Sequence, residues 1–142
     1  RSAKEKPFKV HKKIDNNIAL IKLFPGITLA SLEGFLASNT IKAIILETYG
    51  AGNAPTEAWF LNFLKKIKEK GIIIVNVTQC SGGKVIMGQY ETSVALKSLG
   101  IISGKDITSE AAIAKLMYLL GRKISQSEFK TVFETQIRGE MS

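Results

Sequence analysis

The chain has 142 residues, of which 45% are hydrophobic, and its formal net charge is +8. This length and apolar content are enough for one domain with its own core. A single cysteine, Cys80, excludes an internal disulfide, and a single histidine, His11, leaves too few ligands for a His/Cys metal cluster, so we expect no metal and no cofactor. Because neither a run of 18 apolar residues nor an apolar signal core is present, we expect a cytoplasmic protein that does not contact membranes.

The positive charge is concentrated at the start of the chain. The first 13 residues hold six lysines and arginines against one glutamate, a net charge of +5, and the rest of the chain is nearly balanced. No set of aromatic residues is interleaved with these charges for base stacking, so we do not expect a nucleic-acid partner. We interpret residues 1–17 as a basic interdomain linker and residues 18–142 as one folded domain.

From residue 18 onward, apolar runs of strand length alternate with segments of helical periodicity. The run 18–23 predicts a strand that stops at the turn pair Pro25-Gly26. Apolar residues at helical spacing from 29 to 36 predict a helix capped by Thr28 or Ser31. Residues 43–46 predict the second strand.

The middle of the chain predicts a helix and a fully buried strand. The helix spans 55–70, with Pro55 in its first turn and Gly71 after its last residue. The β-branched run 72–77 is typical of a strand buried on both faces. A polar loop, 78–84, follows it.

The last third adds short elements. Residues 85–90 are compatible with a strand or a loop, 92–99 predict a helix, and 101–103 predict a fourth short strand. Two helices complete the chain, one from Thr108 to residue 120 and one opened by a capping box in which Ser125 is the cap and Glu128 follows three residues later. This alternation predicts an α/β three-layer sandwich, with a small parallel sheet of three to four strands and helices on both faces.

The turn at residues 50–55 is the most informative segment. It holds two glycines and follows a buried strand directly, so it lies at the carboxyl end of a sheet, where α/β proteins place ligands. If the strands 43–46 and 72–77 are parallel neighbours, the loop 78–84 lies beside this turn.

Two residues at these strand ends could take part in chemistry. Cys80 is either a small residue lining a pocket or a catalytic thiol, and we favour the first because His11, in the linker, is poorly placed to activate it. Glu47 either caps a backbone group or lines the cleft, and the sequence leaves both open.

Four ordered blocks give the chain a family resemblance. They are residues 46–55 (LETYGAGNAP), 75–80 (VNVTQC) with 83–85 (GKV), 100–112 (GIISGKDITSEAA) and 138–141 (RGEM). In this order and spacing they resemble the C-terminal domain of the type I, cytoplasmic L-asparaginases, from about residue 17 to the end.

The resemblance implies an amide hydrolase that converts L-asparagine to aspartate and ammonia. It implies that the nucleophilic threonine belongs to an N-terminal domain absent from this sequence, so the chain alone is expected to be inactive. It further implies a homo-oligomer in which this domain packs on the N-terminal domain of another subunit and completes the active site with Gly50, Gly52 and Asn53. The periplasmic enzymes carry a second asparagine two places after the first, where this chain has Pro55, so the resemblance does not imply a direct substrate contact from this loop.

The resemblance also suggests an effector pocket. Some bacterial type I enzymes bind asparagine as an activator, using an arginine at the end of the second strand and the cysteine of a Thr-Gln-Cys segment. Here Cys80 matches that cysteine and Glu47 takes the arginine position; with Thr48 and Thr78 they form the candidate pocket. Because an arginine pairs with an α-carboxylate and a glutamate repels it, we expect the pocket to be altered or lost, although a glutamate accepts an α-ammonium group.

Two other interpretations remain open from the sequence. One is the matching domain of the asparaginase-like subunit of an archaeal-type Glu-tRNA(Gln) amidotransferase. The other is a free-standing flavodoxin-like binding module. This interpretation does not explain the basic leader, which is the linker segment at residues 1–17.

Overall fold

One parallel sheet organises the protein. The computed structural model describes residues 7–88 and 91–142, so the charges at 1–6 and the end of the segment 85–90 lie outside the described residues. Within the described part the sheet has the order β1-β2-β3-β4, made of β1 (Ile18–Lys22), β2 (Ala43–Thr48), β3 (Ile73–Thr78) and β4 (Ile102–Ser103). The predicted parallel sheet is therefore confirmed, including its short fourth strand.

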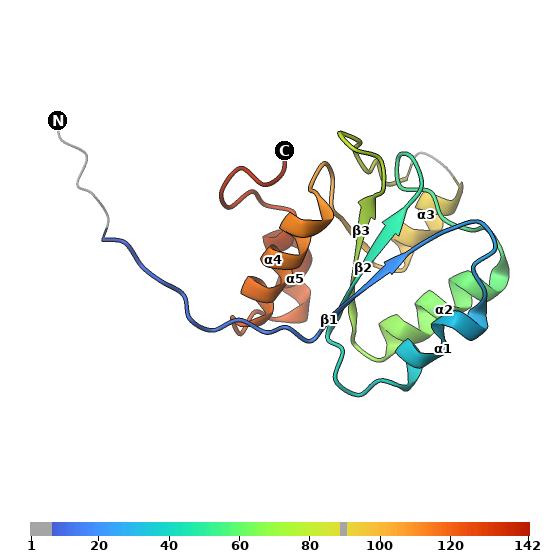
Figure 1. Cartoon of the computed structure of the whole chain (residues 1–142), viewed down its shortest axis with the longest axis horizontal. Helices are drawn as coiled ribbons and strands as arrows, with labels where there is room; N and C mark the ends of the chain where they lie inside the picture. Colours follow the sequence, from blue (N-terminus) through green and yellow to red (C-terminus); the bar gives the residue numbers. More distant parts are fainter. Residues whose placement is uncertain (1–6, 89–90) are drawn as a thin grey trace.

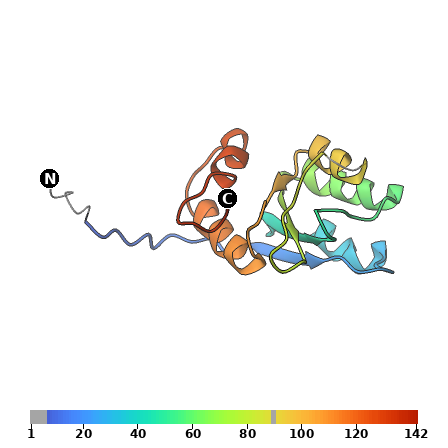
Figure 2. The same ribbon diagram turned by 90° about the horizontal axis from the view of Figure 1, so that it is seen from above.

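Helices cover both faces of this sheet, as Figures 1 and 2 show. One layer holds α1 (Leu29–Ala37), α2 (Ala58–Glu69) and α3 (Glu91–Ser98). The opposite layer holds α4 (Ser109–Leu120) and α5 (Gln126–Phe133). The three-layer α/β sandwich predicted from the alternating pattern is thus the observed architecture.

Each face of the sheet contributes side chains to its own hydrophobic core. Along β2, Ile44 and Leu46 pack with α1 to α3, whereas Ala43 and Ile45 pack with α4 and α5. Successive side chains of a strand point to opposite faces, so a strand covered on both sides needs apolar residues at every position. Every residue of β3 is buried for the same reason.

Helix α2 begins later than predicted. Its first residue is Ala58 with Glu57 at the N-cap, and Pro55 lies in the irregular connector before it. The fixed φ of proline suits an extended connector as well as a first helical turn, so its presence alone did not locate the helix start.

Helix caps were predicted with mixed success. The Thr108 side chain accepts a hydrogen bond from the Ala111 N–H at 3.2 Å, as expected for a cap of α4. The capping box of α5 is not formed, because the Ser125 hydroxyl contacts the Ser127 hydroxyl at 3.2 Å and makes no cap bond. At α1, Ser31 donates to the Thr28 carbonyl instead of capping the helix.

Residues 7–17, the described part of the basic leader, are extended but touch α4 before the chain enters the sheet (Figure 1). The His11 ring packs edge-on against Tyr118 with centroids 5.3 Å apart, and the Asp15 N–H donates to the Met117 carbonyl at 3.0 Å. Gly121 permits this approach, since a Cβ there would lie 2.3 Å from the Lys13 carbonyl oxygen. Across the described ranges, no helix is both long and apolar enough to cross a bilayer.

Candidate functional site

Three loops meet at the carboxyl edge of the sheet (Figure 1). In the parallel register Thr48 pairs with Thr78 and Asn76 pairs with Ser103, so the segments after β2, β3 and β4 leave the sheet side by side. The sequence predicts that the first two of these segments converge. The third, residues 104–108, leads into α4 and was not foreseen.

The glycine turn, residues 50–53, is held at every carbonyl. The four acceptor oxygens and their donors are Gly50 with the Thr78 hydroxyl at 2.5 Å, Ala51 with the Ile86 N–H at 2.9 Å, Gly52 with the Asn76 amide at 3.1 Å and Asn53 with the Tyr49 N–H at 2.8 Å. Each donor comes from a different residue, and all except Tyr49, which directly follows β2, come from β3 or the segment after it. The turn is therefore a fixed part of the site rather than a loose connection.

Gly52 has to be glycine for two reasons. Its φ is +108°, a backbone conformation that side chains disfavour. A Cβ on it would also lie 2.9 Å from a methyl group of Val85 and 3.1 Å from the Asn76 amide nitrogen. The second glycine of the motif thus lets the backbone lie directly against β3.

A polar pocket of about 280 Å³ opens beside this turn. Its described lining residues are Lys22, Glu47, Thr78, Gln79, Cys80, Ser81, Gly82, Gly83, Asp106, Ile107, Thr108, Ser109 and Glu110. It lies between the strand ends, the loop after β3 and the start of α4. The pocket is of a size to receive a small polar molecule.

The charge in this lining is mainly negative. The described lining contains one cationic side chain, Lys22, and three carboxylates, those of Glu47, Asp106 and Glu110. Glu47 is fixed in place, because its Oε1 accepts a 2.7 Å hydrogen bond from the Ser109 hydroxyl at the start of α4. Such a lining favours a ligand with a cationic group over one with an uncompensated carboxylate.

The structure brings together some predicted pocket residues and separates others. Glu47, Thr78 and Cys80 all line the pocket, whereas Thr48 is completely buried and its hydroxyl donates to Asn76 at 2.5 Å. The Thr78 hydroxyl donates to Gly50 and accepts from the Cys80 N–H at 3.0 Å, so it joins the pocket to the glycine turn.

The described lining of the pocket places no histidine beside Cys80. The thiol is exposed, and His11, the one histidine of the sequence, packs against Tyr118 on α4. Sequence reasoning missed Lys22, Asp106 and Ser109 as lining residues, because a single side chain on a strand end or helix start carries no local signal. Asn76 did carry a local signal, because it is an amide residue inside the otherwise aliphatic run 73–77.

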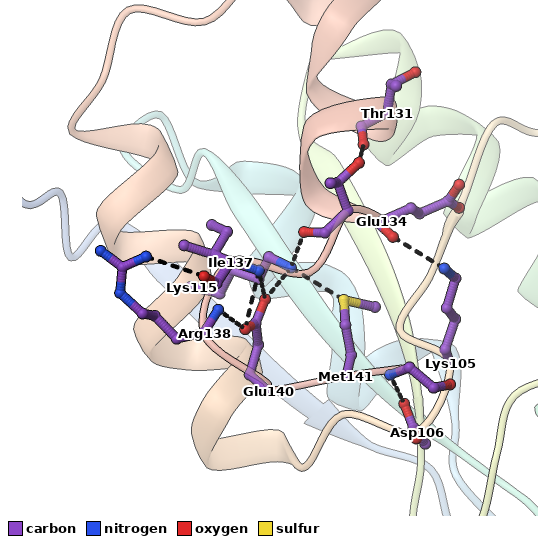
Figure 3. A network of polar contacts seen from close by, with 11 residues as sticks. Lys105, Asp106, Lys115, Thr131, Glu134, Ile137, Arg138, Glu140 and Met141 are labelled. Atoms are coloured by element: carbon purple, nitrogen blue, oxygen red, sulfur yellow. Dashed lines mark hydrogen bonds and ion pairs between the residues drawn. The ribbon is translucent and has the colours of Figure 1, made fainter. Parts of the chain in front are cut away.

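The C-terminal segment supports one wall of the pocket (Figure 3). The Ser142 N–H donates to Asp106 Oδ1 at 2.6 Å, which lowers the pKa of that carboxyl. The segment itself is held by buried Lys115, whose Nζ lies 2.5 Å from Glu140 Oε1 and 2.9 Å from the Thr135 carbonyl oxygen. The ordered tail and the loop after β4 thus form one connected network.

Glu140 also stabilises the turn of the tail. Burial alone would raise the pKa of its carboxyl, but the Lys115 ammonium and the backbone N–H groups of Arg138 and Ile137 together lower that pKa from 4.5 to about 2. The Arg138 N–H lies 2.7 Å from Oε2, and the Ile137 N–H lies 2.9 Å from Oε1.

Fold, glycine turn and edge pocket together define an α/β domain with polar loops gathered at the carboxyl edge of its parallel sheet. The model of the glutaminase/asparaginase C-terminal domain matches residues 17–133, and the chain belongs to this family as its C-terminal domain.

Individual relatives agree with this assignment. The chain is 39% identical to L-asparaginase 1 of Escherichia coli over 133 aligned residues. This alignment covers 94% of the chain and 39% of the Escherichia coli protein. It is 40% identical to a protein named 60 kDa lysophospholipase from Homo sapiens, over 94% of the chain and 23% of that protein. The crystal structure of L-asparaginase I from Vibrio cholerae superimposes with a TM-score of 0.83 at 44% identity, over 90% of this chain and 38% of that one.

The chain therefore spans about two fifths or less of the length of these proteins. Amidotransferase subunits of the Glu-tRNA(Gln) type match as well, at 29% to 32% identity. The family match and the higher identities favour the asparaginase interpretation over this alternative and over a flavodoxin-like module.

Proposed function

We propose that this chain is the supporting domain of an L-asparaginase, which hydrolyses L-asparagine to L-aspartate and ammonia. In this proposal a larger N-terminal domain carries the nucleophile. The present domain takes part in subunit assembly within a homo-oligomer and completes the active site with the glycine turn. Alone, the chain is inactive, and the whole protein acts in the cytoplasm.

The observation that supports this role best is the way in which the glycine turn is held. All four of its carbonyls accept hydrogen bonds, so Asn53 is presented from a fixed backbone at the edge of the sheet. Preorganised polar groups of this kind lower the cost of binding a polar substrate. Asn53 is half-buried at this edge, and its Oδ1 accepts a 3.4 Å hydrogen bond from the Thr92 hydroxyl.

The direct test is ammonia release. The 142-residue chain and the same domain joined to its N-terminal domain are incubated with L-asparagine and, separately, L-glutamine. We expect ammonia only from the two-domain protein, and the ratio of the two rates identifies the preferred amide. Cys80→Ala in the two-domain protein is the control, since a catalytic thiol would lose all activity on this change. Turnover by the isolated chain at the rate of the whole protein would overturn the proposal.

We further propose that the edge pocket is a modified effector site. Glu47 takes the place where the resemblance implies an arginine, and two more carboxylates line the pocket with it. The pocket is therefore suited to bind an α-ammonium group better than an α-carboxylate. Thr78 and Cys80 belong to this proposed site, and the structure gives Thr48 a different place, in the buried contact with Asn76.

A further inference from the structure

Asn76 is a polar residue in a strand built for burial. The other residues from 73 to 77 of β3 are isoleucine or valine, and Asn76 is completely buried among them. A buried amide is costly unless each of its polar atoms finds a partner. An aliphatic residue at this place would serve the core equally well, so the amide calls for an explanation outside the core.

The contacts of the Asn76 side chain supply that explanation. Its Oδ1 accepts a hydrogen bond from the Thr48 hydroxyl at 2.5 Å, and its Nδ2 donates to the Gly52 carbonyl at 3.1 Å. The Nδ2 group also donates a hydrogen bond to the Met87 sulfur at 3.5 Å. Because the Gly52 carbonyl can only accept, the amide nitrogen must face the turn, and the amide oxygen at the other end accepts from the Thr48 hydroxyl.

The bond to Gly52 determines the orientation of the next residue. The peptide unit that joins Gly52 to Asn53 is planar, so its carbonyl and its N–H point in opposite directions. Asn76 holds the carbonyl end, and the Tyr49 carbonyl accepts from the Asn53 N–H at 2.8 Å. With both ends of this plane held, the backbone of Asn53 has little freedom to rotate.

We propose that Asn76 is a positioning residue, which sets the orientation of Asn53 for substrate through the Gly52–Asn53 peptide. This inference rests on the proposed function, in which Asn53 completes the active site. Asn76 itself does not reach the substrate. Its effect on the reaction passes through one hydrogen bond and one peptide plane.

The test is a double-mutant cycle on the two-domain enzyme, with kcat and KM for L-asparagine measured for Asn76→Ala, Asn53→Ala and the double variant. We expect Asn76→Ala to raise KM about tenfold with kcat within about twofold, because a lost substrate contact weakens binding. In the Asn53→Ala background the same change should have no further effect on KM, since residues that act through one another are not additive.

A control variant separates positioning from a general loss of stability. Val75→Ala removes buried atoms from the same strand, but Val75 faces the α4 and α5 core, on the opposite side of the sheet from the Asn76 side chain. We expect it to lower the melting temperature while KM stays at the wild-type value. If Val75→Ala raised KM as much as Asn76→Ala, the effect would be one of strand stability and the inference would fail.

The remaining outcomes also decide the question. Unchanged KM in folded Asn76→Ala, or full additivity with Asn53→Ala, overturns the inference while the proposed function stands. Unchanged kinetics in Asn53→Ala removes the proposed role of the turn and the inference with it. If Asn76→Ala does not fold, Thr48→Val decides, because it removes the hydroxyl that donates to the Asn76 amide oxygen and so loosens the amide: KM should rise about threefold, and an unchanged KM overturns the inference.

Discussion

Lys115 on α4 and Glu140 in the C-terminal segment form an ion pair with a 2.5 Å separation between Nζ and Oε1. The lysine side chain is only 3% exposed, so its charge has almost no access to water. Figure 3 shows that this pair and the backbone groups around it tie the last turn of the chain to α4.

Breaking this pair from one side should destabilise the domain strongly. Glu140→Gln leaves the Lys115 ammonium buried without its counter-charge, so we expect the free energy of unfolding to fall by about 3 kcal/mol. Urea denaturation measures this loss. Lys42→Met is the matched control, since the Lys42 side chain is 56% exposed in its pair with Asp15, and it should cost less than about 1 kcal/mol. Equal small losses in both variants would contradict the prediction.

The same pair predicts how stability changes in acid. The pKa of Glu140 is about 2 in the folded protein, against an ordinary value of 4.5 in the unfolded chain. A lowered folded-state pKa means that the stabilisation is complete above pH 4.5 and is lost as the pH falls toward 2. Unfolding free energies of the wild type and Glu140→Gln, measured from pH 6 downward, should therefore converge over this interval. A gap that stays constant to pH 2 would show that the carboxylate charge has no part in it.

Gly121 should control the contact between the leader and α4. A Cβ at this position would meet the Lys13 carbonyl at 2.3 Å, so Gly121→Ala displaces the leader from the helix end. We expect faster trypsin cleavage after Lys12 and Lys13, with a loss of stability of no more than about 1 kcal/mol because the leader is largely exposed. In α1, Gly34→Ala adds a methyl group that meets nothing within 4 Å and should leave cleavage unchanged. Identical cleavage of both variants would contradict this account.

The edge pocket should respond to its charge. In the two-domain enzyme with Glu47, we expect hyperbolic kinetics with L-asparagine, because the carboxylates of the lining oppose an α-carboxylate. Glu47→Arg should raise the affinity of the pocket for L-asparagine about tenfold, measured by calorimetry with an enzyme that cannot turn over. Sigmoidal kinetics in the unmodified enzyme that disappear on changing Thr78 or Cys80 to bulkier residues would contradict the prediction.

The fold was predictable because its signals are periodic. The aliphatic runs of β2 and β3 repeat the same local requirement at each residue, and the ends of α2, α3 and α4 are marked by Gly71, Gly100 and Gly121. Cap bonds were less predictable: Thr108 forms its bond to Ala111, whereas Ser125 lies at the start of α5 without one. A cap depends on one rotamer, and a neighbouring hydroxyl is enough to redirect it.

The site was only partly predictable. The glycine turn and Glu47 lie at strand ends, where topology alone directs attention. Asp106 and Ser109 reach the pocket because the short strand β4 brings α4 beside β2, a relationship that spans about sixty residues of sequence. Lys115 looks like a surface residue in the sequence, and only its partner from the tail explains its burial.

Because the C-terminal segment buries the Lys115 amine, the chemical reactivity of this amine reports whether the segment is attached to α4. Acylating reagents modify lysines that water reaches, so native protein should be labelled at Lys42 long before Lys115. Detachment of the last few residues would uncover this amine, and mass spectrometry of the labelled peptides would then read the fraction of molecules with an open C-terminus, without any added probe.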